Sequence, residues 1–161
     1  MLHGLNVMNS VLFLDIDGVM VLKNGDGGLY DHDPFDKDCV IVLNDIIEKT
    51  ECEIIISSTW KHFLDLKQMQ EIFSWNGVQK TPHGFTPNYK EKSEEEESAS
   101  IKCREIIGWL SNNNAGDRYS WCATDDWDLS FALQNFVGCR DYKKGLKSKG
   151  VSEKIIAYLK K

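Results

Sequence analysis

The sequence predicts an α/β fold in which helices pack against a mostly parallel sheet. Short apolar segments of strand length alternate along the 161 residues with longer segments whose apolar residues recur at helical spacing. Such alternation is typical of α/β proteins. Polar residues follow three of the expected strands, and ligands of these sheets bind beyond the carboxyl ends of the strands. The length suits a single domain, 1–161, with one sizeable core.

Two strands and two helices are expected in the first half of the chain. Residues 11–14 and 52–57 are short apolar runs that we interpret as buried strands, the second ending at Ser57. Residues 37–49 place their apolar side chains on one face of a helix. Residues 60–75 are interpreted as a second helix. The order strand, helix, strand, helix is the expected start of the sheet.

Two connections are too short to hold a folded domain. Residues 19–36 contain Asn-Gly and Asp-Gly pairs, which are turn formers, and they predict a short flap. Residues 77–99 include two Thr-Pro pairs and predict an extended connection that runs into an acidic stretch. We therefore expect that neither connection forms a large cap domain over the sheet. A ligand site at the carboxyl ends of the strands would then be open to large substrates.

Another helix, two strands and a closing helix are expected in the second half. The helix covers about residues 100–112, and Ser93 with Glu96 is interpreted as a capping box ahead of it. Residues 120–124 and 135–139 are interpreted as strands, and the last residues of the chain as a helix. The alternation of strands and helices thus continues to the end.

The charge and the apolar runs limit the functions to consider. The formal net charge of -6 argues against loose, sequence-independent binding to nucleic acid, which usually requires a basic surface. It is compatible with a nucleotide or a nucleic-acid end that a few local groups bind. The N-terminal residues lack the pattern of a signal peptide, and no run approaches the ~20 apolar residues of a membrane span. We expect a cytoplasmic protein without membrane contact.

The five cysteines follow no metal-binding or redox spacing. Their number is odd, the chain has no C-x-x-C pair, and three of them lie in apolar stretches. We expect most of them to be reduced core residues, which indicates a reducing compartment. The cysteines are Cys39, Cys52, Cys103, Cys122 and Cys139.

Four acids and one serine stand at the ends of predicted strands. Asp15 and Asp17 follow the first strand, Ser57 ends the second, and Asp125 and Asp126 follow the third. Because the carboxyl ends of parallel strands meet at one edge of a sheet, we expect these side chains to converge. Clustered carboxylates raise one another's pKa unless a cation compensates, and Mg²⁺ is commonly held by one or two carboxylates together with substrate phosphate. The pattern predicts a site for Mg²⁺ and phosphate.

Each part of this pattern has a simpler interpretation by itself. A lone D-x-D is common, and a lone Asp-Asp after a strand is usually a cap or a turn. An EF-hand calcium loop is disfavoured, because "DIDGVM" lacks a third ligand at the required spacing and "NGDGGL" lacks the distal Glu. The shared position of the acids at strand ends is what favours the cation site.

Three segments resemble motifs of the haloacid dehalogenase (HAD) superfamily of phosphohydrolases. "FLDIDGV" resembles the first motif, D-x-D-G-x-[TV]. "EIIISSTW" resembles the second, an apolar strand ending in Ser or Thr, and "WCATDD" resembles the fourth, an apolar strand ending in two acids. The resemblance implies a three-layer, Rossmann-like (HAD-like) fold with helices on both faces of a mostly parallel sheet.

The closer likeness is to the small HAD domains of Swiss army knife RNA repair proteins. "SSTWK", "GFTP" and "KCREIIGWL" are similar to segments of those domains, and the likeness covers about residues 11–146. Lys61 stands where an Arg is usual, and the acidic stretch 94–97 is not part of the pattern. Aligning the helix segment places Lys102 at the basic position of the third motif, with Arg104 as the alternative.

The resemblance implies a role for each site residue. Asp15 would be the nucleophile that forms an aspartyl-phosphate, and Asp17 the general acid and base. The metal ligands would be Asp15, the backbone carbonyl of Asp17, and either Asp125 or Asp126. The phosphoryl group would be bound by Ser57, the backbone N–H of Ser58, and Lys102.

The supporting residues also have simpler interpretations. Ser57 can be an ordinary turn serine, and Lys102 can be a solvated helix residue. Trp60 and Trp109 are more often packing residues than platforms for a substrate.

Together these expectations favour a Mg²⁺-dependent phosphomonoester hydrolase, that is, a HAD-type phosphatase, with an open site and a phosphorylated substrate. One alternative is a phosphatase that processes 3′- or 5′-phosphorylated nucleic-acid ends. The other is a non-catalytic binding or regulatory module on a HAD scaffold. The open site is compatible with a small metabolite, a nucleotide, a nucleic-acid end or a protein as the phosphorylated partner.

Overall fold

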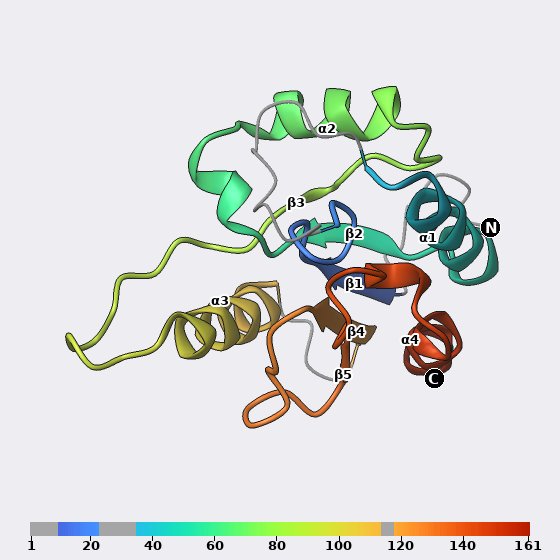
Figure 1. The fold of residues 1–161 in the computed structure, drawn as a ribbon. Helices are drawn as coiled ribbons and strands as arrows, with labels where there is room; N and C mark the ends of the chain where they lie inside the picture. Colours follow the sequence, from blue (N-terminus) through green and yellow to red (C-terminus); the bar gives the residue numbers. More distant parts are fainter. Residues whose placement is uncertain (1–9, 23–34, 114–117) are drawn as a thin grey trace, which may run out of the picture.

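In the residues that the structure describes, five parallel strands form one sheet at the centre of the molecule (Figure 1). The computed structural model describes residues 10–22, 35–113 and 118–161. The strands are β1 (Ser10–Leu14), β2 (Glu53–Ile56), β3 (Gly84–Phe85), β4 (Ser120–Asp125) and β5 (Phe136–Gly138). Their order is β3-β2-β1-β4-β5, and every neighbouring pair runs parallel. The predicted α/β fold is confirmed.

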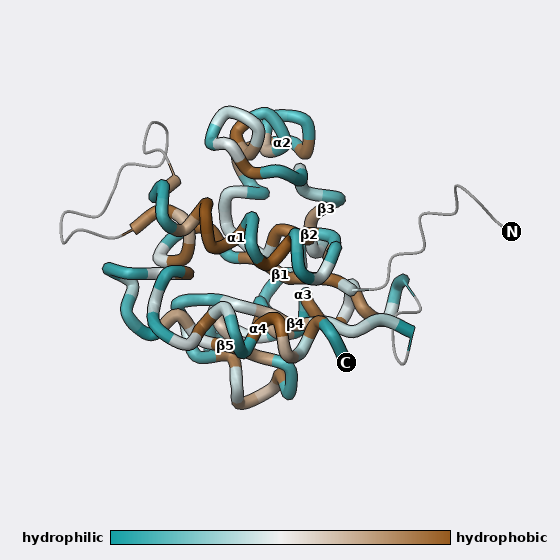
Figure 2. Tube along the Cα trace, turned by 90° about the vertical axis from the view of Figure 1, so that its right-hand side faces the viewer, coloured by the Kyte–Doolittle hydropathy of each residue, from teal (hydrophilic) through white to brown (hydrophobic). Residues whose placement is uncertain are grey.

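Helices cover both faces of this sheet. They are α1 (Lys37–Thr50), α2 (Leu66–Trp75), α3 (Ser98–Asn112) and α4 (Val151–Leu159), with 3₁₀ turns η1 (Thr59–His62) and η2 (Gly145–Lys147). Side chains alternate along β1: Leu12 and Leu14 pack with α1, α2 and α4, whereas Val11 and Phe13 pack with α3. Figure 2 shows the hydrophobic stretches of α1, β1 and β2 gathered between the layers. The predicted three-layer arrangement is confirmed.

Aromatic contacts fill the core on each side of the sheet. The rings of Phe13 and Trp109 meet edge to face with centroids 5.4 Å apart, so Trp109 is a packing residue as expected. On the other side, Phe35 and Phe73 meet edge to face at 5.1 Å. All five cysteines are buried and free, which confirms their prediction as core residues.

The predicted helix over residues 60–75 is wrong in its first part. Residues Thr59–His62 form η1, and α2 begins only at Leu66. The Asp65 carboxylate accepts a hydrogen bond from the backbone N–H of Gln68 at 2.8 Å, and the Gln68 side chain accepts one from the N–H of Asp65 at 2.9 Å. This capping box starts a new helix, which is why the apolar pattern does not continue as one element.

The predicted capping box of Ser93 and Glu96 is also wrong. The helix α3 begins at Ser98, two residues earlier than expected, and its N-cap residue Glu97 makes no side-chain cap bond. The Glu96 carboxylate instead pairs with the guanidinium of Arg104 at 2.7 Å. The same carboxylate also accepts a hydrogen bond from the backbone N–H of Lys92 at 2.6 Å, so it bonds the residue before Ser93 and the α3 guanidinium instead of closing a box with Ser93.

The connections add little structure to the sheet. The edge strand β3 lies within the extended connection 77–99 and pairs with β2 over two residues. Of the predicted flap at 19–36, residues 23–34 lie outside the described residues. In the described ranges no insertion of domain size separates the strands, as expected for a fold without a large cap. No helix in those ranges is long and apolar enough to cross a membrane.

Candidate active site

The carboxyl ends of β1, β2 and β4 meet at one edge of the sheet. Backbone hydrogen bonds continue the ladder past the end of β1: the N–H of Asp15 donates to the Thr124 carbonyl at 3.2 Å, and the N–H of Ser57 donates to the Leu14 carbonyl at 2.9 Å. Asp125 is the last residue of β4. The ends of these three strands therefore place Asp15, Ser57 and the Asp125–Asp126 pair beside one another.

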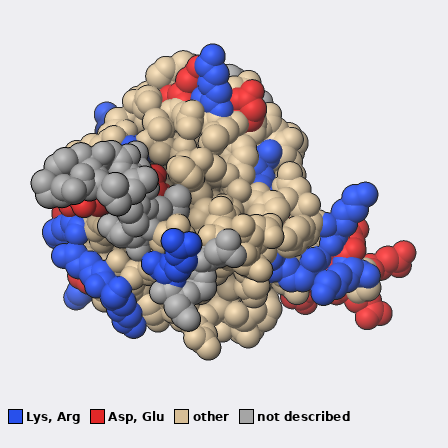
Figure 3. Space-filling model, turned by 180° about the vertical axis from the view of Figure 1, so that it is seen from behind, with Lys and Arg blue, Asp and Glu red and all other residues tan. Residues whose placement is uncertain are grey.

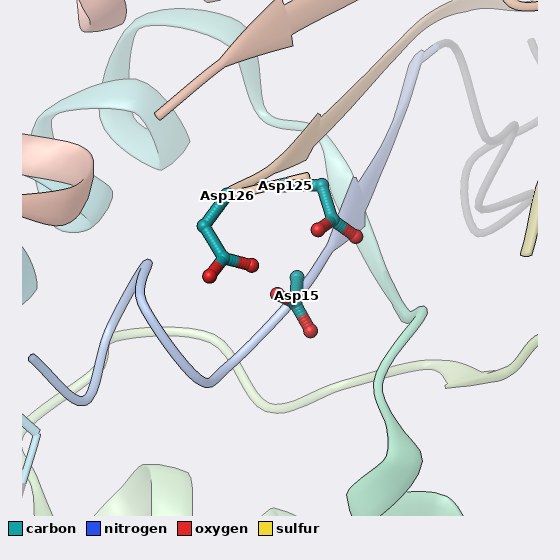
Figure 4. A group of neighbouring side chains, drawn as sticks. All are labelled: Asp15, Asp125 and Asp126. Carbon is teal, nitrogen blue, oxygen red and sulfur yellow. The ribbon is translucent and has the colours of Figure 1, made fainter. Parts of the chain in front are cut away.

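Three carboxylates form the centre of the site. The side chains of Asp15, Asp125 and Asp126 point toward one another (Figure 4), and one oxygen of each lies within 4.8 Å of the others. Asp15 and Asp125 are buried, and Asp126 is partly exposed. Burial raises the pKa of Asp15 well above its ordinary value, and the charges of the two neighbouring aspartates add to this rise. Burial likewise raises the pKa of Asp125.

Lys102 on α3 supplies a positive charge to this group. Its Nζ lies 3.1 Å from Oδ1 of Asp15 and 2.5 Å from Oδ2 of Asp125, and the side chain is almost fully buried. Burial alone would lower the pKa of Lys102, but the attraction of the two carboxylates outweighs burial and raises that pKa. In return, the ammonium opposes the upward pKa shift of both carboxylates.

Arg104, the alternative basic residue, lies away from the carboxylates. Its guanidinium pairs with Glu96 and donates to the Lys90 carbonyl at 2.7 Å. Two positions along an α-helix turn a side chain by about 200°, so Lys102 and Arg104 project from nearly opposite faces of α3. The structure places Lys102 at the site.

The donor set at this edge fits a hard divalent cation. Three carboxylates face one ammonium, so negative charge exceeds positive charge when all four groups are ionised. Carboxylate oxygens are the ligands that Mg²⁺ prefers, and it commonly uses one or two of them together with water and substrate phosphate. A cation here would offset the repulsion between Asp15, Asp125 and Asp126.

The glycine of the first motif lets the turn after β1 approach Asp126. Gly18 has φ of +79°, and a Cβ at this position would lie 2.5 Å from Oδ2 of Asp126. The turn is tight, since the backbone N–H groups of residues 19–21 all donate to the Ile16 carbonyl at 2.8–3.1 Å. Glycine alone combines this backbone conformation with so close a neighbour.

The two serines after β2 have different surroundings. The hydroxyl of Ser57 is buried and has no hydrogen-bond partner in the described part of the chain. Ser58 behaves as a turn serine, because its Oγ accepts a hydrogen bond from the Trp60 N–H at 3.2 Å and caps η1. Buried hydroxyls normally have a partner, so the geometry of Ser57 suits an oxygen atom of a ligand.

Asp17 lies apart from the three convergent carboxylates. It is partly exposed, and Nε1 of the buried Trp60 donates a hydrogen bond to its Oδ2 at 3.2 Å. Sequence reasoning assigned Trp60 to packing, and no pattern of apolar residues reports where an indole N–H points. The metal ligand predicted at Asp17 is its backbone carbonyl, and that role stays a prediction.

A buried ion pair that sequence reasoning did not assign joins three of the family-like segments. Nζ of Lys61 lies 3.0 Å from Oε1 of Glu105 and donates to the Thr86 hydroxyl and the Pro87 carbonyl, each at 2.9 Å. The other carboxylate oxygen of Glu105 accepts a hydrogen bond from the Tyr89 N–H at 2.9 Å. The segments "SSTWK", "GFTP" and "KCREIIGWL" thus meet in one network. Their joint occurrence in the sequence was the signal that could have indicated this contact.

A pocket of about 330 Å³ opens beside Lys102. Its walls come from the turn after β2, from residues 89–91, from α3, and from Trp127. Tyr89 and Trp127 keep 37% and 39% of their surface exposed, and the Nζ of Lys102 lies 4.8 Å from the centre of the Trp127 ring. The pocket therefore combines exposed aromatic rings with a basic group that also contacts the carboxylates.

Comparison with known proteins identifies the family of the chain. Residues 11–151 match the family described as the HAD domain in Swiss Army Knife RNA repair proteins. No curated protein and no solved structure gave a significant match. The matched range begins in β1, ends at the first residue of α4, and includes all the site residues described above. Membership of a HAD family indicates hydrolase chemistry of the phosphatase type. The chain belongs to the family of HAD domains found in Swiss Army Knife RNA repair proteins.

Proposed function

We propose that the protein is a Mg²⁺-dependent phosphomonoester hydrolase that acts through an aspartyl-phosphate. The observation that carries the proposal is the contact of Lys102 with Asp15 and Asp125 at the carboxyl edge of the sheet. Phosphoryl transfer chiefly requires positioning and electrostatic stabilisation of the transferred group. A buried nucleophilic carboxylate between an ammonium and a set of cation ligands meets that requirement.

The reaction would proceed in two steps that use different acids. First, a carboxylate oxygen of Asp15 attacks phosphorus, the ester P–O bond breaks, and Asp17 gives its proton to the leaving oxygen. Then Asp17 takes a proton from water, the water oxygen attacks phosphorus, and inorganic phosphate leaves with Asp15 restored. Mg²⁺, held by Asp15, the Asp17 carbonyl and Asp125 or Asp126, would supply positive charge next to the phosphoryl oxygens.

Three groups of the chain would orient the phosphoryl group. The hydroxyl of Ser57 would donate to one of its oxygens, which gives this buried hydroxyl a partner. The backbone N–H of Ser58 would bind a second oxygen. The ammonium of Lys102 would offset negative charge on the phosphoryl group and orient the Asp15 carboxylate for its attack on phosphorus.

The test is hydrolysis of 4-nitrophenyl phosphate with and without Mg²⁺. Asp15→Asn should abolish turnover, because an amide does not form the acyl phosphate. Asp45→Asn is the matched control, since this carboxylate is exposed on α1 and pairs only with Lys49 among the ion pairs of the described residues. Turnover that survives Asp15→Asn would rule out the covalent mechanism.

A second candidate is a phosphatase for 3′- or 5′-phosphorylated nucleic-acid ends. The pocket beside Lys102 favours it, because exposed Tyr and Trp rings are the usual platforms for unpaired bases. The family description, which names RNA repair proteins, agrees with it. Figure 3 shows basic and acidic side chains next to one another at the top and the right edge of that face, and the formal net charge of -6 suits a locally bound end better than a long duplex.

A panel of phosphorylated oligonucleotides, nucleotides and sugar phosphates separates the candidates. A preference for oligonucleotide ends in kcat/KM supports the second candidate, and equal rates across the panel contradict it. Inactivity on the whole panel, together with no Mg²⁺ binding by calorimetry, would instead favour a non-catalytic binding or regulatory module.

A further inference from the structure

The indole of Trp60 is fixed in the structure from several directions. The side chain is 5% exposed, and its ring lies 6.5 Å from that of Phe35. The backbone N–H of Trp60 donates to the Ser58 hydroxyl, and its carbonyl accepts hydrogen bonds from the next turn of chain at 3.0 Å. The Nε1–H is thereby directed at Oδ2 of Asp17, 3.2 Å away.

A fixed N–H donor has a specific consequence for a carboxyl group that transfers protons. An indole N–H can only donate, so it bonds an oxygen of Asp17 that is accepting. The bond from Trp60 therefore fixes the position of Oδ2 and, with it, the direction in which Oδ1 points. The hydrogen bond from Trp60 also limits rotation of the Asp17 side chain, which is only partly buried.

We propose that Trp60 is a positioning residue for Asp17, holding Oδ2 so that Oδ1 faces the leaving oxygen of the substrate. This inference rests on the proposed phosphatase function. It adds a residue of the second-motif turn to the acid–base apparatus, although Trp60 itself touches no reacting atom. It also explains why a tryptophan, rather than any other large apolar residue, suits position 60.

The dependence of rate on the leaving group tests the proposal. Trp60→Phe keeps an aromatic ring and removes the N–H. Glycerol 2-phosphate releases a basic alkoxide that needs the proton of Asp17, whereas 4-nitrophenyl phosphate releases a stable phenolate that does not. We expect kcat/KM to fall by roughly 10²-fold on the alkyl ester, the cost typical of a misplaced catalytic group, and far less on the aryl ester.

Two comparisons make the result specific. Trp109→Phe alters another buried tryptophan, which packs on Phe13 away from Asp17, and should leave the ratio of the two rates unchanged. In an Asp17→Asn background, Trp60→Phe should cause no further loss on the alkyl ester, because the two residues act as one unit. An equal loss on both esters, or an additive loss in the double variant, would overturn the proposal.

A second measurement does not require Trp60→Phe to fold. In the indole N–H region of the NMR spectrum, Asp17→Ala should shift the Trp60 signal and speed its exchange with water, while the Trp109 signal stays in place. An unchanged Trp60 signal would overturn the proposal. Wild-type protein that is inactive on both esters with Mg²⁺ would refute the proposed function itself, whereas activity with an unchanged ester ratio in Trp60→Phe refutes only the role of Trp60.

Discussion

At the scale of single residues, Lys102 balances the charge of the site. Lys102→Met leaves Asp15 and Asp125 buried without this ammonium. We expect the free energy of unfolding without Mg²⁺ to fall by about 3–5 kcal/mol, the usual cost of removing one partner of a buried ion pair. If the proposed function is correct, phosphatase activity should fall with it, because Asp15, the proposed nucleophile, loses its orienting group. Urea denaturation and the aryl phosphate assay measure the two effects.

Arg104→Met is the matched control for this prediction. Arg104 pairs with Glu96 away from the three carboxylates, so its loss should change activity little, although the pair is part-buried and its loss should lower the free energy of unfolding. Equal losses of activity in the two variants would contradict the placement of Lys102, rather than Arg104, in the site.

The raised pKa of Asp15 predicts a pH dependence of stability. A carboxyl group whose pKa is higher in the folded than in the unfolded protein binds more protons when folded. Its contribution to stability therefore falls as pH rises from the ordinary value of 3.8 toward the raised value. Without Mg²⁺, the Tm of Asp15→Asn relative to wild type should climb across that range and then level off.

Mg²⁺ provides the internal check on this pH dependence. A cation bound to the carboxylates favours their ionised forms, so it should stabilise wild type most at pH values above the raised pKa. The difference in Tm between Asp15→Asn and wild type could instead stay constant with pH. That result would show that burial does not raise the pKa of Asp15 in the folded protein.

Single residues also show how far sequence reasoning reached. The meeting of Asp15, Asp125 and Asp126 could be predicted, because parallel strands that end in register bring their next residues together. The choice between Lys102 and Arg104 needed the orientation of α3, which the motif alone left open. The bond from Trp60 to Asp17 could not be predicted, since burial patterns carry no information about the direction of a side-chain donor.

At the scale of elements, the ion pair of Lys61 and Glu105 fixes α3 against the turn after β2. Glu105 lies one helical turn beyond Lys102 and on the same face, so the pair also sets the position of Lys102. Lys61→Met and Glu105→Gln each leave one buried group without its charged partner, and each should cost about 3–5 kcal/mol in urea denaturation. The double variant should lose less than the sum.

An exposed ion pair on α1 is the control for this coupling. Lys49 and Asp45 are paired at 3.1 Å with about half of each side chain exposed, and the same double-mutant cycle on them should show little coupling. If the losses of unfolding free energy for Lys61→Met and Glu105→Gln add strictly, the two side chains do not stabilise the contact between α3 and the turn after β2 as a pair.

Element boundaries were the least predictable part of the fold. The apolar pattern over residues 60–75 runs without interruption, although Asp65 followed by Gln68 is a readable capping signal that pattern matching alone passes over. The strand β3 has two residues and exists through its pairing with β2, so no local periodicity marks it. Long buried segments, by contrast, were placed to within a residue or two at most ends.

At the scale of the whole molecule, the order β3-β2-β1-β4-β5 places β1, the strand that leads into Asp15, at the centre of the sheet. The neighbours β2 and β4 then deliver Ser57 and Asp125 from either side, and α3 approaches from one face with Lys102. Strand alternation predicted the parallel sheet, but the order of strands is a long-range property that only the folded chain reveals. The pocket beside Lys102 is likewise assembled from four distant segments.

The composition of that pocket predicts how substrates are distinguished. Trp127→Ala removes an exposed ring next to Lys102, and loss of one stacked base typically costs about 1–3 kcal/mol. If bases stack here, KM for a phosphorylated oligonucleotide should rise by a matching factor, far more than KM for a sugar phosphate.

Phe131→Ala is the matched control, because Phe131 is 64% exposed in the same connection after β4 but does not line the pocket. Trp127 also contacts Lys102. A fall in kcat for both the oligonucleotide and the sugar phosphate would therefore indicate that the substitution disturbs the pairing of Lys102 with the carboxylates. Only a selective rise in KM for the oligonucleotide would report a base platform. Equal KM changes for the two substrates would remove the case for nucleic-acid ends and leave the phosphatase chemistry of the carboxylate edge intact.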